Sequence, residues 1–198
     1  MSIDSSRPAA PTQGWRVVDI VVAAVLGVAG GLVFWAWNGP GYAIYEAANA
    51  LTPGLGGLSQ GFWLIAGPVG GLIIRKPGAA VFVTLIAATI SMALGNTWGV
   101  QTLLFGLAEG VGAELAFLIF AYRRHTLFVA ILAGVLAGVF EWGSELVTGN
   151  MAKSFAFNLI YLLSNMVSGA ILAGVVAWLL MKALARTGVL ARFAAGRE

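Results

Sequence analysis

Residues 103–147 read LLFGLAEGVGAELAFLIFAYRRHTLFVAILAGVLAGVFEWGSELV, an apolar run interrupted once, by the basic segment Tyr122-Arg123-Arg124-His125. Each half is long enough to cross a hydrocarbon layer of about 30 Å, so the run predicts two membrane-spanning helices joined by a short turn. The two helices carry four glutamates, Glu109, Glu114, Glu141 and Glu145. A carboxylate costs about 2.5–3.5 kcal/mol at the centre of a spanning helix, so four on one hairpin indicate a function beyond anchoring.

Two of these acids, Glu109 and Glu141, are predicted to lie at one depth in the membrane. Counted from the arginine turn, each is about 20 Å along its helix, in the same half of the bilayer. Both must face the interior of the helix bundle, because lipid does not solvate a carboxylate. Together they predict the floor of a binding pocket. Glu114, nearer the midplane, and Glu145, nearer the outer surface, fit the alternative of a structural polar network better.

The composition also indicates a membrane protein. Of the 198 residues, 60% are hydrophobic and 10% charged, and the mean hydropathy is +0.91. Several spanning helices need that much apolar surface and a soluble domain of this length does not. The chain has no cysteine, which excludes disulfides and cysteine metal sites. We predict an all-α fold with six transmembrane helices, Val17–Trp37, Leu58–Ile74, Ala79–Leu94, the two helices of the hairpin and Phe155–Met181, with a short surface helix over Tyr42–Leu51.

The distribution of basic residues predicts the orientation. With six spans and an internal N-terminus, ten lysines and arginines fall in inner segments and only Lys153 in an outer one. This asymmetry places both termini in the cytoplasm and accounts for the high pI, so a nucleic-acid role has no support. The expected organisation is a disordered cytoplasmic tail at 1–14, a six-helix membrane domain at 15–184 and a basic cytoplasmic tail at 185–198. Arg16 and Asp19 are expected to form a solvated pair at the inner interface.

Aromatic residues gather toward the predicted outer side. Five of the seven tryptophans fall there, Trp35, Trp37, Trp63, Trp98 and Trp142. Interfacial belts occupy both faces of a membrane, so anchoring explains this excess only in part. Tryptophan beside carboxylates suits a flat, cationic or amine-bearing ligand, and Trp142, next to Glu141, is the residue expected to stack on it. Anchoring is the alternative for any one tryptophan, and Glu46, in the outer loop, is expected to be solvated.

The last predicted span carries a polar stripe. Asn158, Tyr161, Asn165 and Ser168 recur there at helical spacing. With the acids and the outer tryptophans, Tyr161 and Asn165 are predicted to line one outward-facing cavity. A polar network that only holds the bundle together is again the alternative.

Small residues recur at every fourth position of the first predicted span, at Ala23, Gly27 and Gly31. Such a face is a groove in which another helix lies close. The groove either packs inside the bundle or docks a partner membrane protein, and the pattern alone does not separate these two possibilities.

Motifs for enzyme chemistry are missing from the sequence. His125 is the only histidine, lies among arginines and is expected to be a solvated loop residue, so no metal site is predicted. None of the three lysines follows a glycine, so there is no Walker phosphate loop, and no Gly-x-Ser-x-Gly is present. No catalytic residue or cofactor is expected, and any ATP hydrolysis must come from a partner.

Two segments resemble a known family. They are Leu72-Ile-Ile-Arg-Lys-Pro-Gly-Ala-Ala80, and Gly110-Val-Gly-Ala-Glu-Leu-Ala-Phe117 followed by Tyr122-Arg123. Both are similar to the YkoE group of energy-coupling factor transporter S components, over roughly Val17 to Ala183. The resemblance implies a multi-pass, substrate-binding subunit in the cytoplasmic membrane of a prokaryote. It also implies thiamine or its hydroxymethylpyrimidine precursor as ligand, with a transmembrane coupling subunit and two cytoplasmic ATPase subunits as partners.

The resemblance also implies roles for particular residues. In this family the first helix docks the coupling subunit through small residues, which favours docking for Ala23, Gly27 and Gly31. The positions that match the family's pocket in kind are Glu109, Glu141, Trp142, Tyr161 and Asn165, and Glu145, Trp63 and Trp98 are added as candidates. The rival hypothesis is a stand-alone carrier of a small cationic or amine-bearing solute, in which the glutamates relay protons.

Overall fold

The computed structural model describes residues 14–196, which form helices and turns without a strand. The predicted hairpin is confirmed, since α4 ends at Ile119 and α5 begins at Leu127 after a short turn. The helices are α1 (Val17–Leu51), α2 (Ala66–Ile74), α3 (Ala79–Ala93), α4 (Gln101–Ile119), α5 (Leu127–Glu145), α6 (Phe155–Ser168) and α7 (Val176–Arg186). A 3-10 segment, Leu55–Phe62, precedes α2, and π-helical segments, Leu146–Asn150 and Gly169–Val175, extend α5 and join α6 to α7.

Five helical stretches in the described part of the chain are long and apolar enough to cross a membrane. They are Val17–Leu51, Leu55–Ile74, Gln101–Ile119, Leu127–Asn150 and Phe155–Arg186. The remaining apolar helix, α3, has 15 residues and is shorter than the usual crossing length of about 20. A sixth crossing at α3 therefore stays a prediction.

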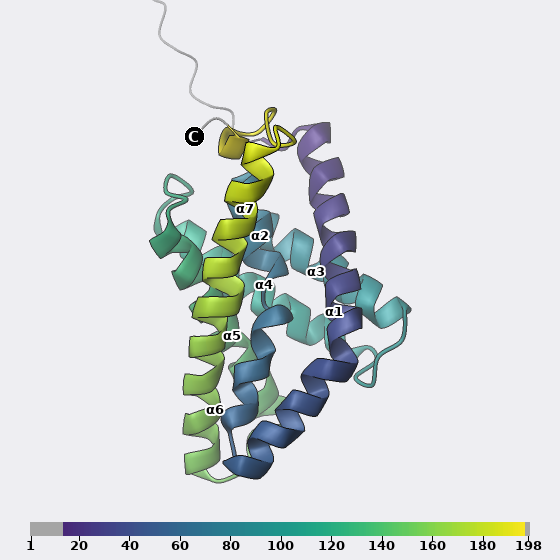
Figure 1. Ribbon diagram of the computed structural model, residues 1–198, viewed down its shortest axis with the longest axis vertical. Coiled ribbons are helices and arrows are strands. Elements are labelled where there is room, and N and C mark those ends of the chain that lie inside the picture. Colours follow the sequence, from purple (N-terminus) through teal and green to yellow (C-terminus); the bar gives the residue numbers. More distant parts are fainter. Residues whose placement is uncertain (1–13, 197–198) are drawn as a thin grey trace, which may run out of the picture.

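The first helix is longer than expected. The predicted end at Trp37 and the separate helix over Tyr42–Leu51 are both wrong, because α1 continues through Pro40 to Leu51. Proline removes one backbone hydrogen bond and bends a helix, and the ribbon of α1 changes direction part way along (Figure 1). Side chains next to the bend hold both parts in place. Trp37 Nε1 donates to Ser59 O at 3.0 Å, and Asn38 Oδ1 accepts from Trp63 Nε1 at 2.9 Å.

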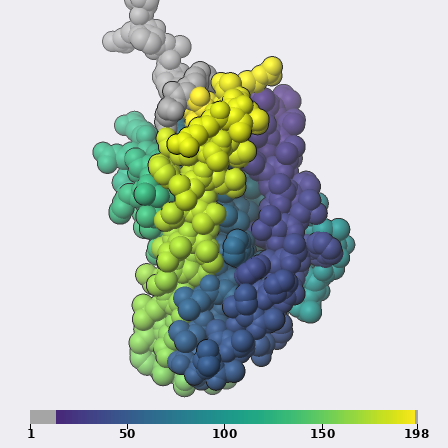
Figure 2. All heavy atoms as spheres, in the orientation of Figure 1, coloured from purple at the N-terminus to yellow at the C-terminus, as the bar shows by residue number. Residues whose placement is uncertain are grey.

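The second apolar stretch changes from 3-10 to α-helix within the predicted span. Gly57 and Gly61 lie against α6, where a Cβ on Gly57 would be 2.8 Å from the Tyr161 carbonyl oxygen. Ser168 ties the segment to α6 by donating to Leu58 O at 2.7 Å and accepting from Gly61 N at 2.9 Å. The space-filling view shows this stretch closely packed between the distal half of α1 and α6 (Figure 2). Its packing carries polar side chains into the bundle.

The small-residue face of α1 packs against α3 of the same chain. Ala23, Gly27 and Gly31 are all buried. A Cβ on Gly27 would lie 2.6 Å from Ile86 Cβ, and one on Gly31 the same distance from Ile90 Cβ. The groove is thus filled internally, so the packing alternative describes this structure, and the docking face suggested by the family resemblance is already occupied.

Glu114 has a structural position, as the alternative of a polar network predicted. It caps the N-terminus of α3, accepting from Gly78 N at 2.6 Å and Ala80 N at 2.8 Å. Gly78 adopts a left-handed conformation (φ 84°), which turns the chain into the helix. Tyr122 Oη donates to the same carboxylate at 2.8 Å. Burial, that hydrogen bond and the negative charge raise the pKa of Tyr122.

The expected solvated pair at the start of α1 is instead half buried. Asp19 has no exposed surface and accepts from Arg16 Nη2 at 2.7 Å, while Arg16 is partly exposed. The hydrogen bond and the charge of Asp19 raise the pKa of Arg16. Arg16 also lies over the ring of Phe193, 5.9 Å from its centroid. Phe193 and Leu190 are buried, so the chain beyond α7 packs onto the bundle.

The basic turns meet at the end of the molecule where both described chain ends lie (Figure 1). Trp15 Nε1 donates to Pro77 O at 3.0 Å, which joins the start of α1 to the turn between α2 and α3. The Glu114–Tyr122 contact joins the turn between α4 and α5 to the same place. The tail predicted at residues 1–14 lies outside the described residues except for Gly14.

The internal packing of α1 on α3 predicts that Gly27→Leu destabilises the isolated chain. The added side chain meets Ile86, and overpacking costs about 1–3 kcal/mol. The midpoint of thermal unfolding in detergent should fall well below that of Ala29→Leu, a matched change at an exposed position of α1. Equal midpoints for the two variants would contradict the internal packing.

The cap on α3 predicts a loss of stability for Glu114→Gln. In wild type the backbone N–H groups of Gly78 and Ala80 donate to the two carboxylate oxygens. The glutamine amide replaces one of these acceptor oxygens by an NH₂ donor, and a hydrogen bond to a charged group contributes about 1.5–3 kcal/mol. Thermal unfolding in detergent measures the change. Glu46→Gln, at an exposed position, is the control and should unfold like wild type; a wild-type midpoint for Glu114→Gln would rule out the capping role.

Candidate functional site

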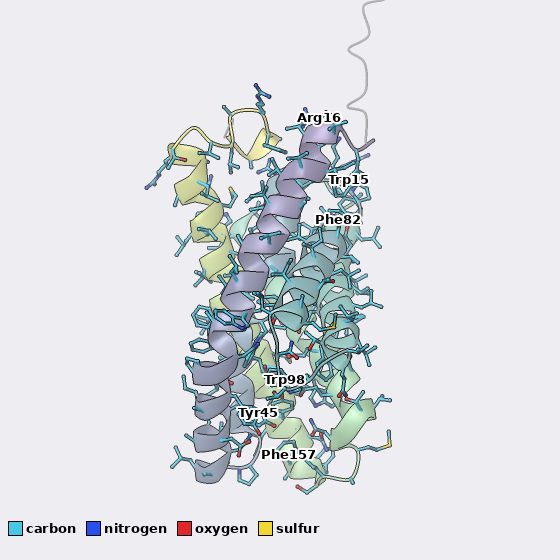
Figure 3. The ribbon with its side chains drawn as sticks, turned by 90° about the vertical axis from the view of Figure 1, so that its right-hand side faces the viewer. Trp15, Arg16, Tyr45, Phe82, Trp98 and Phe157 are labelled. Carbon is cyan, nitrogen blue, oxygen red and sulfur yellow. The ribbon has the colours of Figure 1, made fainter. Side chains whose placement is uncertain are left out.

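A cavity of about 320 Å³ lies among α1, the 3-10 segment, α3, α4 and α5. Figure 3 shows Tyr45 and Trp98, which line it, in the half of the molecule away from Trp15 and Arg16. The wall combines aromatic rings, amides, hydroxyls and acids. Its charged and aromatic members are Phe34, Tyr42, Tyr45, Glu46, Trp63, Trp98, Phe105, Glu109, Glu141, Glu145 and Lys153.

Three glutamates of the hairpin face this cavity. Glu109 comes from α4, and Glu141 and Glu145 come from successive turns of one face of α5. Glu109 and Glu141 are each only 4% exposed. In all three side chains the buried Oε2 atom has no hydrogen-bond partner, and their charges act on one another. A buried acceptor without a donor is unfavourable, so this end of the cavity suits a ligand that brings N–H groups or positive charge.

Tryptophan and tyrosine rings form a second side of the cavity. Trp63 and Trp98 meet edge to face, with centroids 5.8 Å apart and an interplanar angle of 79°. Tyr42 meets Trp98 in the same manner at 6.1 Å, and it stacks on Tyr45 at 6.0 Å. The hydrogen bond from Trp63 to Asn38 on α1 fixes that ring. Such a wall can receive a flat aromatic ligand by stacking and a cation by cation–π contact.

Gln60 is a lining residue that the sequence analysis missed. It is buried and donates from Nε2 to Tyr161 Oη at 2.6 Å. The available signal was an amide inside the glycine-rich stretch Gly56–Gly61, where a buried polar side chain needs a partner. Asn38, which donates to Ser91 Oγ at 3.3 Å, is a second amide in the wall.

Three of the predicted site residues lie outside the cavity lining. Trp142 Nε1 donates to Asn158 O at 3.0 Å and so joins α5 to α6. Tyr161 is fully buried behind the wall, where it holds Gln60 and meets Tyr45 edge to face at 6.1 Å. Asn165 is fully buried, and neither polar atom of its side chain has a partner. Trp142 does not line this cavity, whereas Trp63 and Trp98 do.

Two further polar residues differ from their expected surroundings. Glu46, expected in a loop, is on α1 and lines the cavity while remaining exposed. His125 is half buried rather than solvated and stacks on Phe117, with centroids 5.7 Å apart. Among residues 14–196, no group of three or more His, Asp or Glu side chains is placed to hold a metal ion.

Three comparisons relate the chain to known proteins. Residues 18–140 match the family described as "ABC-type cobalt transport system, permease component". The "Putative HMP/thiamine permease protein YkoE" of Bacillus subtilis (strain 168) is 33% identical over 191 residues, which are 94% of this chain and 92% of the relative. A solved structure described as "Crystal structure of an S-component of ECF transporter" superposes with a TM-score of 0.78 at 30% identity, covering 93% of this chain and 92% of that one.

The buried bond between Gln60 and Tyr161 predicts a stability loss for Tyr161→Phe. The change leaves the Gln60 amide without an acceptor, and an unsatisfied buried group costs about 1–3 kcal/mol. Thermal unfolding in detergent should show a lower midpoint than for Tyr42→Phe, because the Tyr42 side chain is about half exposed and loss of its hydroxyl leaves no buried group unpaired. If both variants unfold together, the Gln60–Tyr161 bond does not hold the wall.

Proposed function

The chain belongs to the S components of energy-coupling factor transporters, and from that premise we propose that its cavity binds thiamine or hydroxymethylpyrimidine for uptake. The family predicted from the motifs at residues 72–80 and 110–117 is thus the right one. S components are transport subunits rather than enzymes. One observation carries the proposal, which is the set of three carboxylates, each with a buried and unpartnered oxygen, beside the Trp63–Trp98 pair.

The chemistry of an aminopyrimidine fits this wall. Its exocyclic amino group donates N–H groups to a carboxylate such as Glu109 or Glu141, and charge-assisted bonds of this kind are strong. Its ring nitrogens accept from an amide such as that of Asn38. The flat ring stacks against Trp63 or Trp98, and the thiazolium of thiamine adds a positive charge that aromatic faces and carboxylates attract.

The size of the cavity fits a small ligand. A volume of about 320 Å³ is at the lower end of the range of about 300–1,000 Å³ typical of ligand pockets. In this proposal the cavity opens to the outside of the cell membrane. The support is its position away from the end that gathers the basic turns, which the positive-inside rule assigns to the cytoplasm.

Energy for uptake comes, in this proposal, from a transmembrane coupling subunit and two cytoplasmic ATPases, because the chain has no phosphate-binding loop. The coupling subunit does not use the face of Ala23, Gly27 and Gly31 while α3 covers it. The family membership disfavours the rival, a stand-alone proton-coupled carrier.

The site assignment predicts weaker binding for Glu109→Gln and Glu141→Gln. Each change removes a charged acceptor for the ligand, so the dissociation constant for thiamine or hydroxymethylpyrimidine should rise about tenfold or more. Tryptophan-fluorescence titration of the purified protein measures it, with pyridoxine and riboflavin as competitor vitamins that should not bind. Trp142→Phe is the matched control outside the cavity and should bind as wild type does.

Three results would contradict parts of this proposal. Wild-type affinity in both glutamine variants would move the binding site elsewhere in the chain. Tight binding of riboflavin or pyridoxine, without binding of thiamine or hydroxymethylpyrimidine, would contradict the proposed substrate class. Uptake by the isolated chain in vesicles under a pH gradient would revive the proton-coupled carrier.

A further inference from the structure

One basic side chain, Lys153, lines the cavity together with four acids, Glu46, Glu109, Glu141 and Glu145. It lies in the turn between the π-helical extension of α5 and α6. The turn is held by backbone contacts, with Lys153 N donating to Asn150 O at 3.0 Å and Lys153 O accepting from Asn158 Nδ2 at 3.3 Å. The side chain is exposed, so this bonded turn presents an ammonium group at the cavity.

The Lys153 ammonium group lies at the rim of the cavity that is farther from Arg16. Its Nζ atom lies 4.2 Å from the centroid of the Phe157 ring. Phe157 lies beyond Trp98 and Tyr45, toward the end of the molecule opposite Arg16 (Figure 3). A cation over an aromatic face is stabilised there without leaving water. Phe157 thus offers the ammonium a resting position at the rim.

Lys153 also acts electrostatically on the acids. It attracts Glu145, and Glu145 in turn acts on Glu109 and Glu141. Charges in a partly buried site interact several times more strongly than in water. Among the lining residues Lys153 is therefore the one positive charge set against a cluster of carboxylates.

We propose that Lys153 is a tethered counter-cation at the rim, which competes with a cationic ligand for the carboxylates and so sets the preference between thiamine and hydroxymethylpyrimidine. The inference rests on the proposed function. Both ligands carry the aminopyrimidine, but only thiamine carries a permanent positive charge. The neutral pyrimidine binds without disturbing Lys153. Thiamine meets the repulsion of the ammonium, which lies over the Phe157 ring and already attracts Glu145.

The test compares Lys153→Gln with wild type, both as full-length purified protein. Dissociation constants for thiamine and hydroxymethylpyrimidine are measured by fluorescence titration and calorimetry. Removal of the ammonium should tighten thiamine binding about five- to tenfold and change pyrimidine binding less than about twofold. Lys153→Arg keeps the charge and should keep the wild-type ratio of the two constants. Lys182→Gln, on α7, is the control at a distant position and should also keep it.

Salt provides an independent readout. Raising NaCl from about 50 mM to about 500 mM screens exposed charges, so it should shrink the difference between wild type and Lys153→Gln for thiamine and leave the pyrimidine nearly unaffected. A merely structural lysine would not produce a ligand-dependent salt effect.

Three outcomes overturn the inference and separate it from the proposed function. If wild type binds the ligands and Lys153→Gln keeps the same ratio of constants, Lys153 does not set the preference while the function stands. Weaker thiamine binding in Lys153→Gln would make the lysine a direct ligand contact, which also overturns it. If wild type binds neither ligand, the proposed function itself fails, and this inference fails with it.

Discussion

The placement of four carboxylates on one apolar hairpin, two buried and two partly buried, is the constraint on which the rest of the structure depends. The carboxylate of Glu114 has partners within the protein, since backbone N–H groups at the start of α3 and the Tyr122 hydroxyl donate to its oxygens. Glu109, Glu141 and Glu145 differ, because each keeps a buried oxygen without a donor. The same side chain therefore serves architecture at one end of the molecule and remains available to a ligand at the other. Hydrogen-bond satisfaction, rather than residue type, distinguishes the two roles.

Glycine packing brings the remaining parts of the cavity to these acids. The 3-10 segment approaches α6 closely enough that a side chain at Gly57 or Gly61 would collide with it. Because of this close approach, Gln60 and Trp63 line the cavity. A regular α-helix over the same stretch would direct these two side chains differently. Close contact of α1 with α3 likewise brings Asn38 and the tyrosines of the distal half of α1 to the cavity. The wall is thus assembled from backbones that only small residues allow to come together.

The lengths of the apolar runs predicted most of the helices, because length and hydropathy almost alone determine whether a segment can span a membrane. This criterion failed at Pro40, where packing and the hydrogen bonds of Trp37 and Asn38 outweigh the local penalty of a proline. Counting residues from the arginine turn correctly placed Glu109 and Glu141 together. Such a count does not say in which direction a side chain points from its helix. Residues 141 and 142 are about 100° apart on a helix, whereas 141 and 145 share a face, so helical geometry already favoured Glu145 over Trp142. Small residues at every fourth position predict a close neighbour without identifying it, and here the neighbour is α3.

The two ends of the bundle differ in how completely they are bonded, and this difference bears on transport. At the end where residues 14 and 196 lie, Trp15, Asp19 and Glu114 each bind to a neighbouring turn or side chain, and Phe193 is buried. At the other end, charge is present in excess over its internal partners, and the one nearby ammonium sits on a turn rather than on a helix. In the proposed function, an aromatic ligand with N–H donors supplies what that end lacks. The fully bonded end then keeps the acids in register and the incompletely bonded end receives the ligand, and the hairpin of α4 and α5 runs through both.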